Sequence, residues 1–314
     1  MNKIYTLTMN PAIDLNSTVY KVEAGRKLRC DDLRVEAGGG GVNVARGLQG
    51  LGADACPIFP AAGRLGDYYL HLLEDEGLAC KSIPSKTEMK RLNTNVRSRS
   101  ENKQYRFCTP GPEFDEASCQ KALDLIEERL KPGTILVQSG SLPRGLPSDF
   151  HARVADAVVR AEGTLVLDAP ENLLKALSRT SVAWITPNRK EFEAMVGHSV
   201  KDLDIEAELK KLIDSSPFEN LLLTLGSEGA IYAGAEGYKR LKAPEVEKVG
   251  TVGAGDSAVA GLTLGLAKGL PHVEAAARAV AAGAAAVETP GLNRLDQKEF
   301  KALLRKVMEI NFDD

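Results

Sequence analysis

The sequence predicts an α/β protein of three layers, in which a mostly parallel central sheet lies between helices on both faces. Short apolar runs typical of buried strands alternate with segments whose apolar residues recur at helical spacing. The chain has 314 residues, of which 43% are hydrophobic and 26% charged, and is therefore long enough to bury such a core. Two stretches that break the alternation predict a small antiparallel β lid beside the main sheet.

The predicted strands of the central sheet are short, and Pro or Gly residues mark several joins between elements. These strands are Ile4–Thr8, Ala55–Phe59, Ile135–Gln138, Leu165–Leu167, Ala183–Ile185 and Leu221–Leu225. The predicted helices are Val42–Gly50, Asp67–Glu76, Glu116–Leu130, Phe150–Ala161, Lys190–Met195, Ile205–Ser215, Gly255–Ala267, Val273–Val287 and Gln297–Glu309. Helices that separate successive strands favour parallel pairing through crossovers.

The lid is predicted from two charged stretches, 16–36 and 83–107, which together supply about four strand-like patches. We expect residues 1–12, 37–82 and 109–314 to form a core that binds nucleotide and sugar. Residues 13–36 and 83–108 then form a lid that closes over the substrate. A small exposed sheet with one apolar face needs covering, so we expect a homodimer contact through the lid.

Composition excludes several classes of function. The net charge of −3 provides no basic field for nucleic acid or an anionic membrane. No apolar stretch approaches the roughly 18 residues of a membrane helix, and the N-terminus is too polar for a signal peptide. The five cysteines are scattered without a C-x-x-C pair, which argues for reduced thiols, a cytoplasmic location and no zinc site.

The most informative motif is Gly253-Ala254-Gly255-Asp256, which opens an apolar, Ala-rich helix. Small residues let backbone N–H groups approach an anion closely, and the helix N-terminus adds its positive dipole end. Negative charge that develops during phosphoryl transfer can be held there. Asp256 is placed to take a proton from an attacking hydroxyl, so the motif predicts a kinase of a small hydroxylated molecule.

A second glycine signature, Gly38–Gly41, precedes the helix that contains Asn43. Four consecutive glycines cost backbone entropy, which favours close approach to a ligand over a flexible loop. The Asn43 amide then lies in the first helical turn, where it can bond a sugar hydroxyl. Asp14 follows the first strand and can grip two sugar hydroxyls, although an exposed loop carboxylate is the commoner outcome.

Three further patterns have a structural and a functional interpretation. Asn188 and Glu191 have the spacing of a helix capping box, and they also suit a hydrated Mg²⁺ that bridges phosphates. The turn at Gly140-Ser141 follows a strand end, where open sheets bind ligands. The turn Gly226–Gly229 is either a plain β-turn or the lining of a nucleotide pocket.

Other enzyme classes lack their sequence signatures. There is no Gly-Lys dipeptide, which excludes a Walker P-loop, and no G-x-S-x-G, which argues against a serine hydrolase. The chain satisfies the loose dinucleotide fingerprint G-x-G-x-x-A from Gly50 and from Gly253. The first match follows a helix, and the second places Asp256 where it would repel a pyrophosphate.

Taken together, these motifs resemble the PfkB, or ribokinase-like, family of carbohydrate kinases over essentially the whole chain. The pair Gly38–Arg46 and Thr251–Asp256 is specific in combination. The opening Thr8-x-x-Pro11-x-x-Asp14 and Gly140–Pro143 are similar to the phosphosugar branch. The glycine run lacks the lysine usual in 1-phosphofructokinases and tagatose kinases, and Lys27 is present instead, an arrangement most like the 6-phosphofructokinases of the family.

The resemblance implies a role for each matching residue. Asp256 is the base, and Gly253, Ala254 and Gly255 form the anion hole. Asp14, Gly39 and Asn43 hold the sugar, while Lys27, Arg91 and Ser141 hold its phosphate or the transferred group. Mg²⁺ is organised by Asn188 and Glu191. The ATP groove is lined by Asn188, Thr224, Gly226 and Gly229, with Val280, Gly283 and Ala284 near the adenine. A potassium site in some relatives corresponds to Val252, Ala286 and Gly291.

The activity implied by the resemblance is transfer of the terminal phosphoryl group of ATP, with Mg²⁺, to a hexose phosphate. Fructose 6-phosphate is the expected acceptor, and tagatose 6-phosphate and fructose 1-phosphate are the alternatives. A regulator that binds nucleotide or sugar without turnover is a remote alternative, because the base Asp256 is present.

Overall fold

The central sheet of the computed structural model has nine strands in the order β13-β12-β11-β10-β9-β8-β1-β4-β5. The structure describes residues 2–168, 182–201, 203–216, 218–288 and 295–312. Seven strands from β5 to β11 are parallel, and β12 and β13 pair antiparallel at one edge. The strands are β1 (Ile4–Leu7), β4 (Ala55–Pro60), β5 (Lys81–Ile83), β8 (Ile135–Ser139), β9 (Thr164–Asp168), β10 (Val182–Ile185), β11 (Phe218–Thr224), β12 (Ala230–Gly234) and β13 (Gly237–Leu241).

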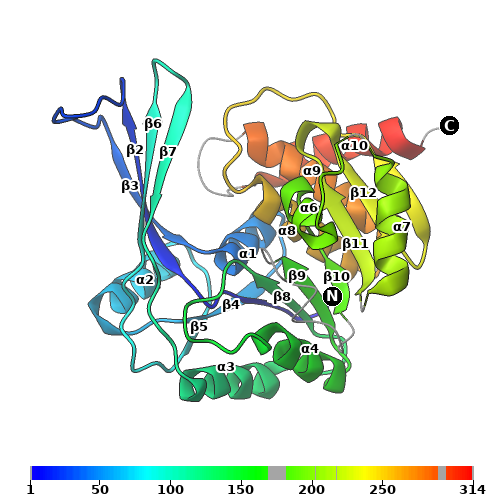
Figure 1. Cartoon of the computed structure of the whole chain (residues 1–314), viewed down its shortest axis with the longest axis horizontal. Helices are drawn as coiled ribbons and strands as arrows, with labels where there is room; N and C mark the ends of the chain where they lie inside the picture. Colours follow the sequence, from blue (N-terminus) through cyan, green and yellow to red (C-terminus); the bar gives the residue numbers. More distant parts are fainter. Residues whose placement is uncertain (1, 169–181, 202, 217, 289–294, 313–314) are drawn as a thin grey trace.

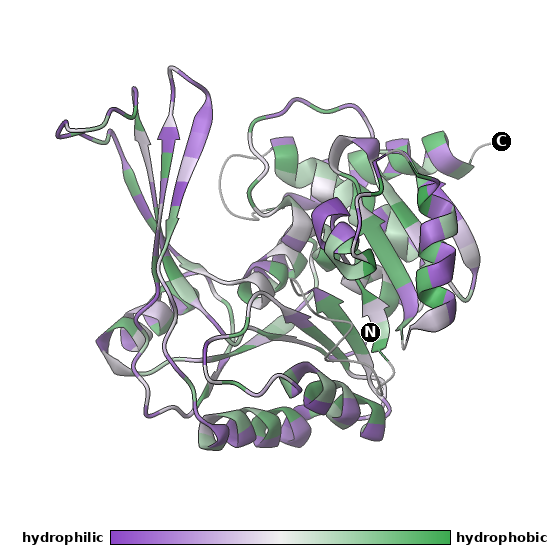
Figure 2. Cartoon of the chain, in the orientation of Figure 1, coloured by the Kyte–Doolittle hydropathy of each residue, from purple (hydrophilic) through white to green (hydrophobic). Residues whose placement is uncertain are grey.

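Helices cover both faces of this sheet, so the predicted three-layer architecture is confirmed (Figure 1). One face packs against α1 (Gly40–Gly50), α8 (Ala254–Ala267), α9 (His272–Glu288) and α10 (Gln297–Phe312). The other packs against α3 (Glu116–Arg129), α4 (Phe150–Arg160), α6 (Arg189–Val196) and α7 (Ile205–Ser215). Figure 2 shows the result of this packing: most of β11 is apolar, whereas α3 and α7 carry both polar and apolar residues.

Two edge strands of the central sheet were not predicted. The strand Lys81–Ile83 has one buried residue, Ile83, and its three residues are too few to show a period. Ile83 therefore belongs to the large sheet, although the sequence placed it at the start of the second lid stretch. The strand β13 alternates exposed and half-buried residues, so it lacks the apolar run by which the other strands were found.

The lid is a separate four-stranded sheet of order β3-β2-β6-β7, which extends away from the core in Figure 1. Its strands are β2 (Ala12–Val19), β3 (Leu33–Gly38), β6 (Leu92–Ser98) and β7 (Lys103–Cys108). The two outer pairs are antiparallel, as predicted, but β2 and β6 pair in parallel, with Asp14 opposite Asn93. The parallel ladder arises because both strands lead out of the core in the same direction. A further helix, α2 (Gly63–Asp75), packs near the base of the lid.

The helices α8 and α9 pack closely because small residues line their contact. A side-chain carbon at Gly261 would overlap the carbonyl oxygen of Arg278 and lie 2.8 Å from Ala282 Cβ. At Gly283 on the facing helix, the nearest atom would be Ala254 O at 3.5 Å, an ordinary contact. Close packing of these helices fixes the start of α8 against the sheet. No helix in the described ranges has the length and apolar character needed to cross a bilayer.

The two glycines predict opposite effects of the same substitution. Gly261→Ala should lower the free energy of unfolding by about 1–3 kcal/mol, because the helices must separate. Gly283→Ala should be neutral or raise it by up to about 1 kcal/mol, since alanine has the higher helix propensity and fits the space. Urea unfolding of both variants measures this difference. Equal loss of stability in both would contradict this account of the helix packing.

Candidate active site

The candidate active site lies where the parallel strands end, at the carboxyl edge of the sheet. A cavity of about 220 Å³ opens there between the strand ends and the first turn of α8. Open parallel sheets bind their ligands at this edge. The polar and glycine residues that line the cavity are Asp168, Thr186, Asn188, Glu191, Thr224, Gly253, Gly255 and Asp256.

The first turn of α8 has the geometry of an anion site. Gly253 is the N-cap and has φ 79°, a left-handed conformation that glycine adopts without strain. A side-chain carbon at Gly255 would meet no atom of the described residues within 4 Å, and Ala254 lies between the two glycines. First-turn N–H groups lack intrahelical acceptors, and the helix dipole adds positive potential. The turn therefore has donors suited to a transferring phosphoryl group, and that role stays a prediction.

Asp256 lies in this turn and receives a hydrogen bond from Asn43. The Asn43 Nδ2 donates to Asp256 Oδ2 at 2.9 Å, across 213 residues of sequence. The two glycine signatures predicted from the sequence are therefore adjacent in space. The Asn43 side chain is buried and its Oδ1 accepts from Arg46, so both ends of the amide have protein partners. Its contact with a sugar hydroxyl stays a prediction.

The glycine run before α1 packs against the protein itself. A side-chain carbon added at Gly38 would overlap the Asp14 carboxyl, and one added at Gly40 would overlap Ser139 Oγ. One added at Gly41 would lie 2.7 Å from Leu7 O. Contacts within the protein therefore already explain the need for glycine at these positions. The sequence had instead predicted that the glycines allow a ligand to approach closely. Gly39 has φ 132°, and its contact with the sugar remains a prediction.

Asp14 lies on lid strand β2 and is 8% exposed, so it is not the exposed loop carboxylate that was the commoner expectation. Asn93 Nδ2 on β6 donates to its Oδ1 at 2.8 Å. Burial raises the pKa of the Asp14 carboxyl above its ordinary 3.8, while the Asn93 hydrogen bond and nearby arginines act in the opposite direction. A buried carboxylate with one hydrogen bond is suited to receive hydroxyl donors.

Arg91 and Ser141 meet through Asn10, which follows β1. Arg91 Nη1 donates to Asn10 O at 2.6 Å, and Asn10 Nδ2 donates to Ser141 Oγ at 3.1 Å. The two residues expected to hold a phosphate therefore contact the same residue, one through its backbone carbonyl and the other through its side chain. Asn10 was not predicted. Its Oδ1 is buried and has no hydrogen-bond partner among the described residues, a feature that only tertiary structure reveals.

Asn188 and Glu191 form the capping box of α6 and also line the cavity. Asn188 Oδ1 accepts from the Glu191 N–H at 3.1 Å, and the Asn188 N–H donates to Glu191 Oε2 at 2.8 Å. The structural interpretation of this spacing is confirmed. The magnesium interpretation stays open, because capping and cavity lining occur together.

Asp168, at the end of β9, is a site residue that the sequence argument missed. Ser139 Oγ and Thr186 Oγ1 donate to its two carboxylate oxygens at 2.8 and 3.1 Å. Burial raises the pKa of Asp168, and the two hydroxyl hydrogen bonds lower it. The available signal was a carboxylate directly after an apolar strand, the same signal that singled out Asp14.

The oxygen atoms of this cavity suit Mg²⁺. Asp168, Glu191 and Asp256 offer carboxylates and Asn188 offers an amide, the hard donors that Mg²⁺ prefers. Among the described residues, no three His, Cys, Asp or Glu side chains form a ready metal cluster. These donors would fit a hydrated Mg²⁺, and its assignment to this site remains a prediction.

Among the residues predicted for ATP and potassium, Thr224 lines the cavity and Gly283 lies near the start of α8. Thr224 ends β11, and Gly226 and Gly229 bound the following turn. Val280, Gly283 and Ala284 lie on α9. Val252 precedes α8, Ala286 lies near the end of α9, and the N–H groups of Val249 and Gly250 donate to Val287 O. Gly291 lies outside the described residues.

Lys27, which was predicted to hold phosphate, lies in the lid and does not line this cavity. It is exposed in the loop between β2 and β3, where its neighbours include Tyr20 and Arg26. Figure 1 shows this loop at the far end of the lid. The role expected for Lys27 therefore remains a prediction.

Residues 3–298 match the family model described as pfkB family carbohydrate kinase. The chain belongs to the pfkB family of carbohydrate kinases. This kinase is 35% identical to ATP-dependent 6-phosphofructokinase isozyme 2 of Mycobacterium tuberculosis, over 99% of this chain and 92% of that protein. It is 33% identical to ATP-dependent 6-phosphofructokinase isozyme 2 of Escherichia coli, over 93% of this chain and 94% of that protein.

Solved structures show the same relationship for this kinase. The crystal structure of Escherichia coli phosphofructokinase-2 with fructose-6-phosphate has a TM-score of 0.90 at 30% identity, and covers 98% of this chain and 99% of that one. Other structures of that enzyme are a potassium complex, with a TM-score of 0.92, and a tetrameric inhibited form, with a TM-score of 0.90.

The raised pKa of Asp14 predicts that Asp14→Asn stabilises the fold. The folded pKa lies above the unfolded one, so the ionised carboxylate destabilises the folded state at neutral pH, and this penalty disappears as the pH falls below about 4. We expect a Tm higher by roughly 1–4 °C at pH 7. Thermal unfolding from pH 7 to pH 4 measures the shrinking difference. The control Asp54→Asn, at an exposed position, should leave Tm unchanged.

Proposed function

We propose that this pfkB-family kinase transfers the terminal phosphoryl group of ATP to the C1 hydroxyl of fructose 6-phosphate. The observation that carries the proposal is the position of Asp256. Its carboxyl lies in the first turn of α8 and lines the cavity at the strand ends. It also accepts a hydrogen bond from Asn43, which belongs to the other glycine signature. A general base beside an anion-binding helix start is the arrangement that phosphoryl transfer to an alcohol requires.

The choice of acceptor rests on two arguments. The relatives named above are 6-phosphofructokinases, and the glycine run lacks lysine. A relative at 29% identity, from Xanthomonas campestris, is a 1-phosphofructokinase, so fructose 1-phosphate remains an alternative acceptor together with tagatose 6-phosphate.

In the proposed mechanism, Asp14 accepts hydrogen bonds from sugar hydroxyls. The sugar phosphate lies near Arg91, Ser141 and Asn10. Asp256 takes the proton of the C1 hydroxyl while the hydroxyl oxygen forms a bond to the γ-phosphorus of ATP. The bond from that phosphorus to the oxygen of the leaving ADP breaks. The first-turn N–H groups of α8 stabilise the transferring group.

We assign Mg²⁺ to the carboxylates Asp168 and Glu191 with Asn188, where it would offset phosphate charge when bound with ATP. Potassium is assigned to the backbone around Val252 and Ala286. The proximity of residues 249–250 to the end of α9 supports this assignment, as does the potassium complex of the Escherichia coli enzyme.

We further propose a homodimer through the lid. Tyr20, which directly follows β2, and Leu33, which begins β3, are 69% and 64% exposed, and Leu28 is exposed in the loop between these strands. Covering such side chains favours association. Lys27 lies in the same loop, so a lid-to-lid contact would bring it toward a second copy. Five cysteines without disulfides support the cytoplasm as the compartment.

The acceptor is tested by ADP release in a coupled assay with equal concentrations of the three hexose phosphates. Fructose 6-phosphate should give the highest kcat/KM. A higher value for either alternative would overturn the assignment of the acceptor but keep the kinase.

Asp256→Asn should lower kcat by on the order of 10³-fold or more, because the amide cannot take the hydroxyl proton. The KM of the sugar should change little. Steady-state kinetics with purified, folded variant measure both constants. Near-normal turnover in this variant would remove Asp256 from its role.

Arg91→Met should raise the KM of fructose 6-phosphate by roughly 10- to 100-fold, since a charge-assisted hydrogen bond to the phosphate is lost. The KM of ATP should be unchanged, and Arg91→Lys should recover part of the affinity. Arg160→Met, which breaks only an exposed ion pair with Glu127, is the matched control. An unchanged sugar KM in Arg91→Met would place the phosphate elsewhere.

A further inference from the structure

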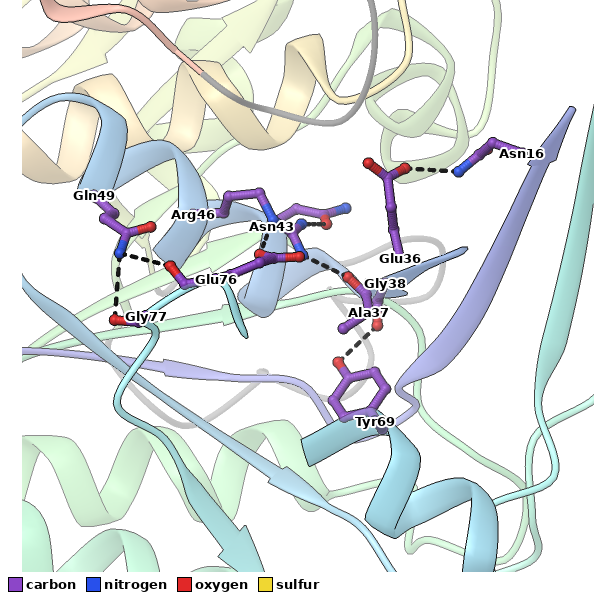
Figure 3. Close-up of polar contacts among 10 residues, drawn as sticks. All are labelled: Asn16, Glu36, Ala37, Gly38, Asn43, Arg46, Gln49, Tyr69, Glu76 and Gly77. Carbon is purple, nitrogen blue, oxygen red and sulfur yellow. Dashed lines mark hydrogen bonds and ion pairs between the residues drawn. The ribbon is translucent and has the colours of Figure 1, made fainter. Parts of the chain in front are cut away.

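A buried arginine, Arg46, donates a hydrogen bond to Asn43, whose amide donates to the proposed base Asp256. Arg46 is one helical turn after Asn43 on α1, and its Nη1 donates to Asn43 Oδ1 at 2.8 Å. Asn43 Nδ2 in turn donates to Asp256 Oδ2. Figure 3 shows Arg46 between the Asn43 amide and Glu76, which follows α2.

The contact with Arg46 decides which way the Asn43 amide faces. An amide has one acceptor end and one donor end, and a guanidinium can only donate. Arg46 therefore selects the rotamer with Oδ1 toward itself, which leaves Nδ2 toward Asp256. In the flipped rotamer, Asn43 Oδ1 would face the carboxylate and Nδ2 would face the guanidinium, so both contacts would be repulsive.

Arg46 itself is fixed by three further hydrogen bonds. Its Nε and Nη2 donate to the two carboxylate oxygens of Glu76 at 2.6 and 3.1 Å, a bidentate pair. Its Nη2 also donates to Ala37 O, at the end of lid strand β3, at 2.7 Å. The Arg46 side chain is 4% exposed and that of Glu76 is 15% exposed, so water screens the pair weakly.

We propose that Arg46, held by Glu76, is a positioning residue that acts on Asp256 only through the orientation of the Asn43 amide. The proposal rests on the proposed function, because it assigns Asp256 the role of base. Arg46 also contacts the lid strand through Ala37, so the same side chain connects the base of the lid to the proposed base.

A double-mutant cycle tests this route of action. Arg46→Met should lower kcat by roughly 10- to 100-fold, the usual effect of losing a group that orients an active-site residue, with little change in the KM of ATP. Asn43→Ala should lower kcat by a similar factor. In the Asn43→Ala background, Arg46→Met should have no further effect on kcat, because the amide through which it acts is gone.

If Arg46 had only a structural role, the double-mutant cycle would give a different outcome. The two effects on kcat would then multiply, and this result would overturn the proposal. Arg46→Lys should recover part of kcat, since it keeps a donor and the charge. Arg153→Met on α4, which covers the opposite face of the sheet from α8, breaks ion pairs with Glu116 and Asp149 and should leave kcat unchanged.

Removing one partner of a buried ion pair can also unfold a protein. If Arg46→Met does not fold, the cycle is run with Glu76→Gln, which keeps the shape and one acceptor oxygen and should lower kcat several-fold. Multiplicative effects of Glu76→Gln and Asn43→Ala would equally overturn the proposal.

A measurement without turnover separates this proposal from the proposed function. The side-chain amide protons of Asn43 should exchange slowly with solvent in ¹⁵N spectra of the wild type and at least tenfold faster in Arg46→Met. The amide of Asn220, bonded to Ala183 O and Tyr232, is the internal control and should not change. Equal protection of Asn43 in both proteins would overturn the positioning role even if every sugar assay failed.

Discussion

The hydrogen bond between Asn43 and Asp256 is the interaction on which the active site depends. It joins the first turns of two helices, α1 and α8, that lie far apart in the sequence. Each helix start is rich in glycine, and at α1 these glycines pack closely against the ends of β1 and β8. The bond therefore sets the position of the carboxyl relative to the strand ends that form the rest of the cavity.

Glycine residues also let the two helices joined by this hydrogen bond pack closely against their neighbours. Gly40 and Gly41 let α1 lie against the ends of β1 and β8, and Gly261 lets α9 lie against α8. Each contact excludes a single side-chain carbon, so small displacements are not tolerated. Two helix starts are thereby held at fixed distances from the sheet, and a base needs this constancy to meet a hydroxyl oxygen within hydrogen-bond reach.

Much of the fold could be predicted from periodicity, and the site could be predicted only in part. Buried strands such as β8 begin with a continuous apolar run, which the sequence displays directly. The three-residue β5 displays no period, so it was missed. Asp256 and Asn43 were found because a glycine-rich helix start costs backbone entropy and therefore indicates a close contact. Asp168 was missed because its two hydroxyl donors come from β8 and from the residue after β10, a relationship that exists only once the sheet has formed.

The spacing at Asn188 and Glu191 shows a different limit of sequence reasoning. A capping box and a metal site require the same residue types at the same separation, so the local pattern could not distinguish them. The structure shows the cap and the cavity together. The pair Arg46–Glu76 shows a third limit, since nothing in either local sequence identifies the partner thirty residues away.

The separation of Asn43 and Asp256 along the chain has a consequence for biosynthesis. During synthesis the N-terminal segments leave the ribosome first, and Asp256 follows after four-fifths of the chain. A nascent or truncated polypeptide that ends before α8 contains the lid strands but lacks Asp256, the proposed base. With Asp256 in that role, we expect incomplete chains not to consume nucleotide and turnover to begin only when the final helices dock.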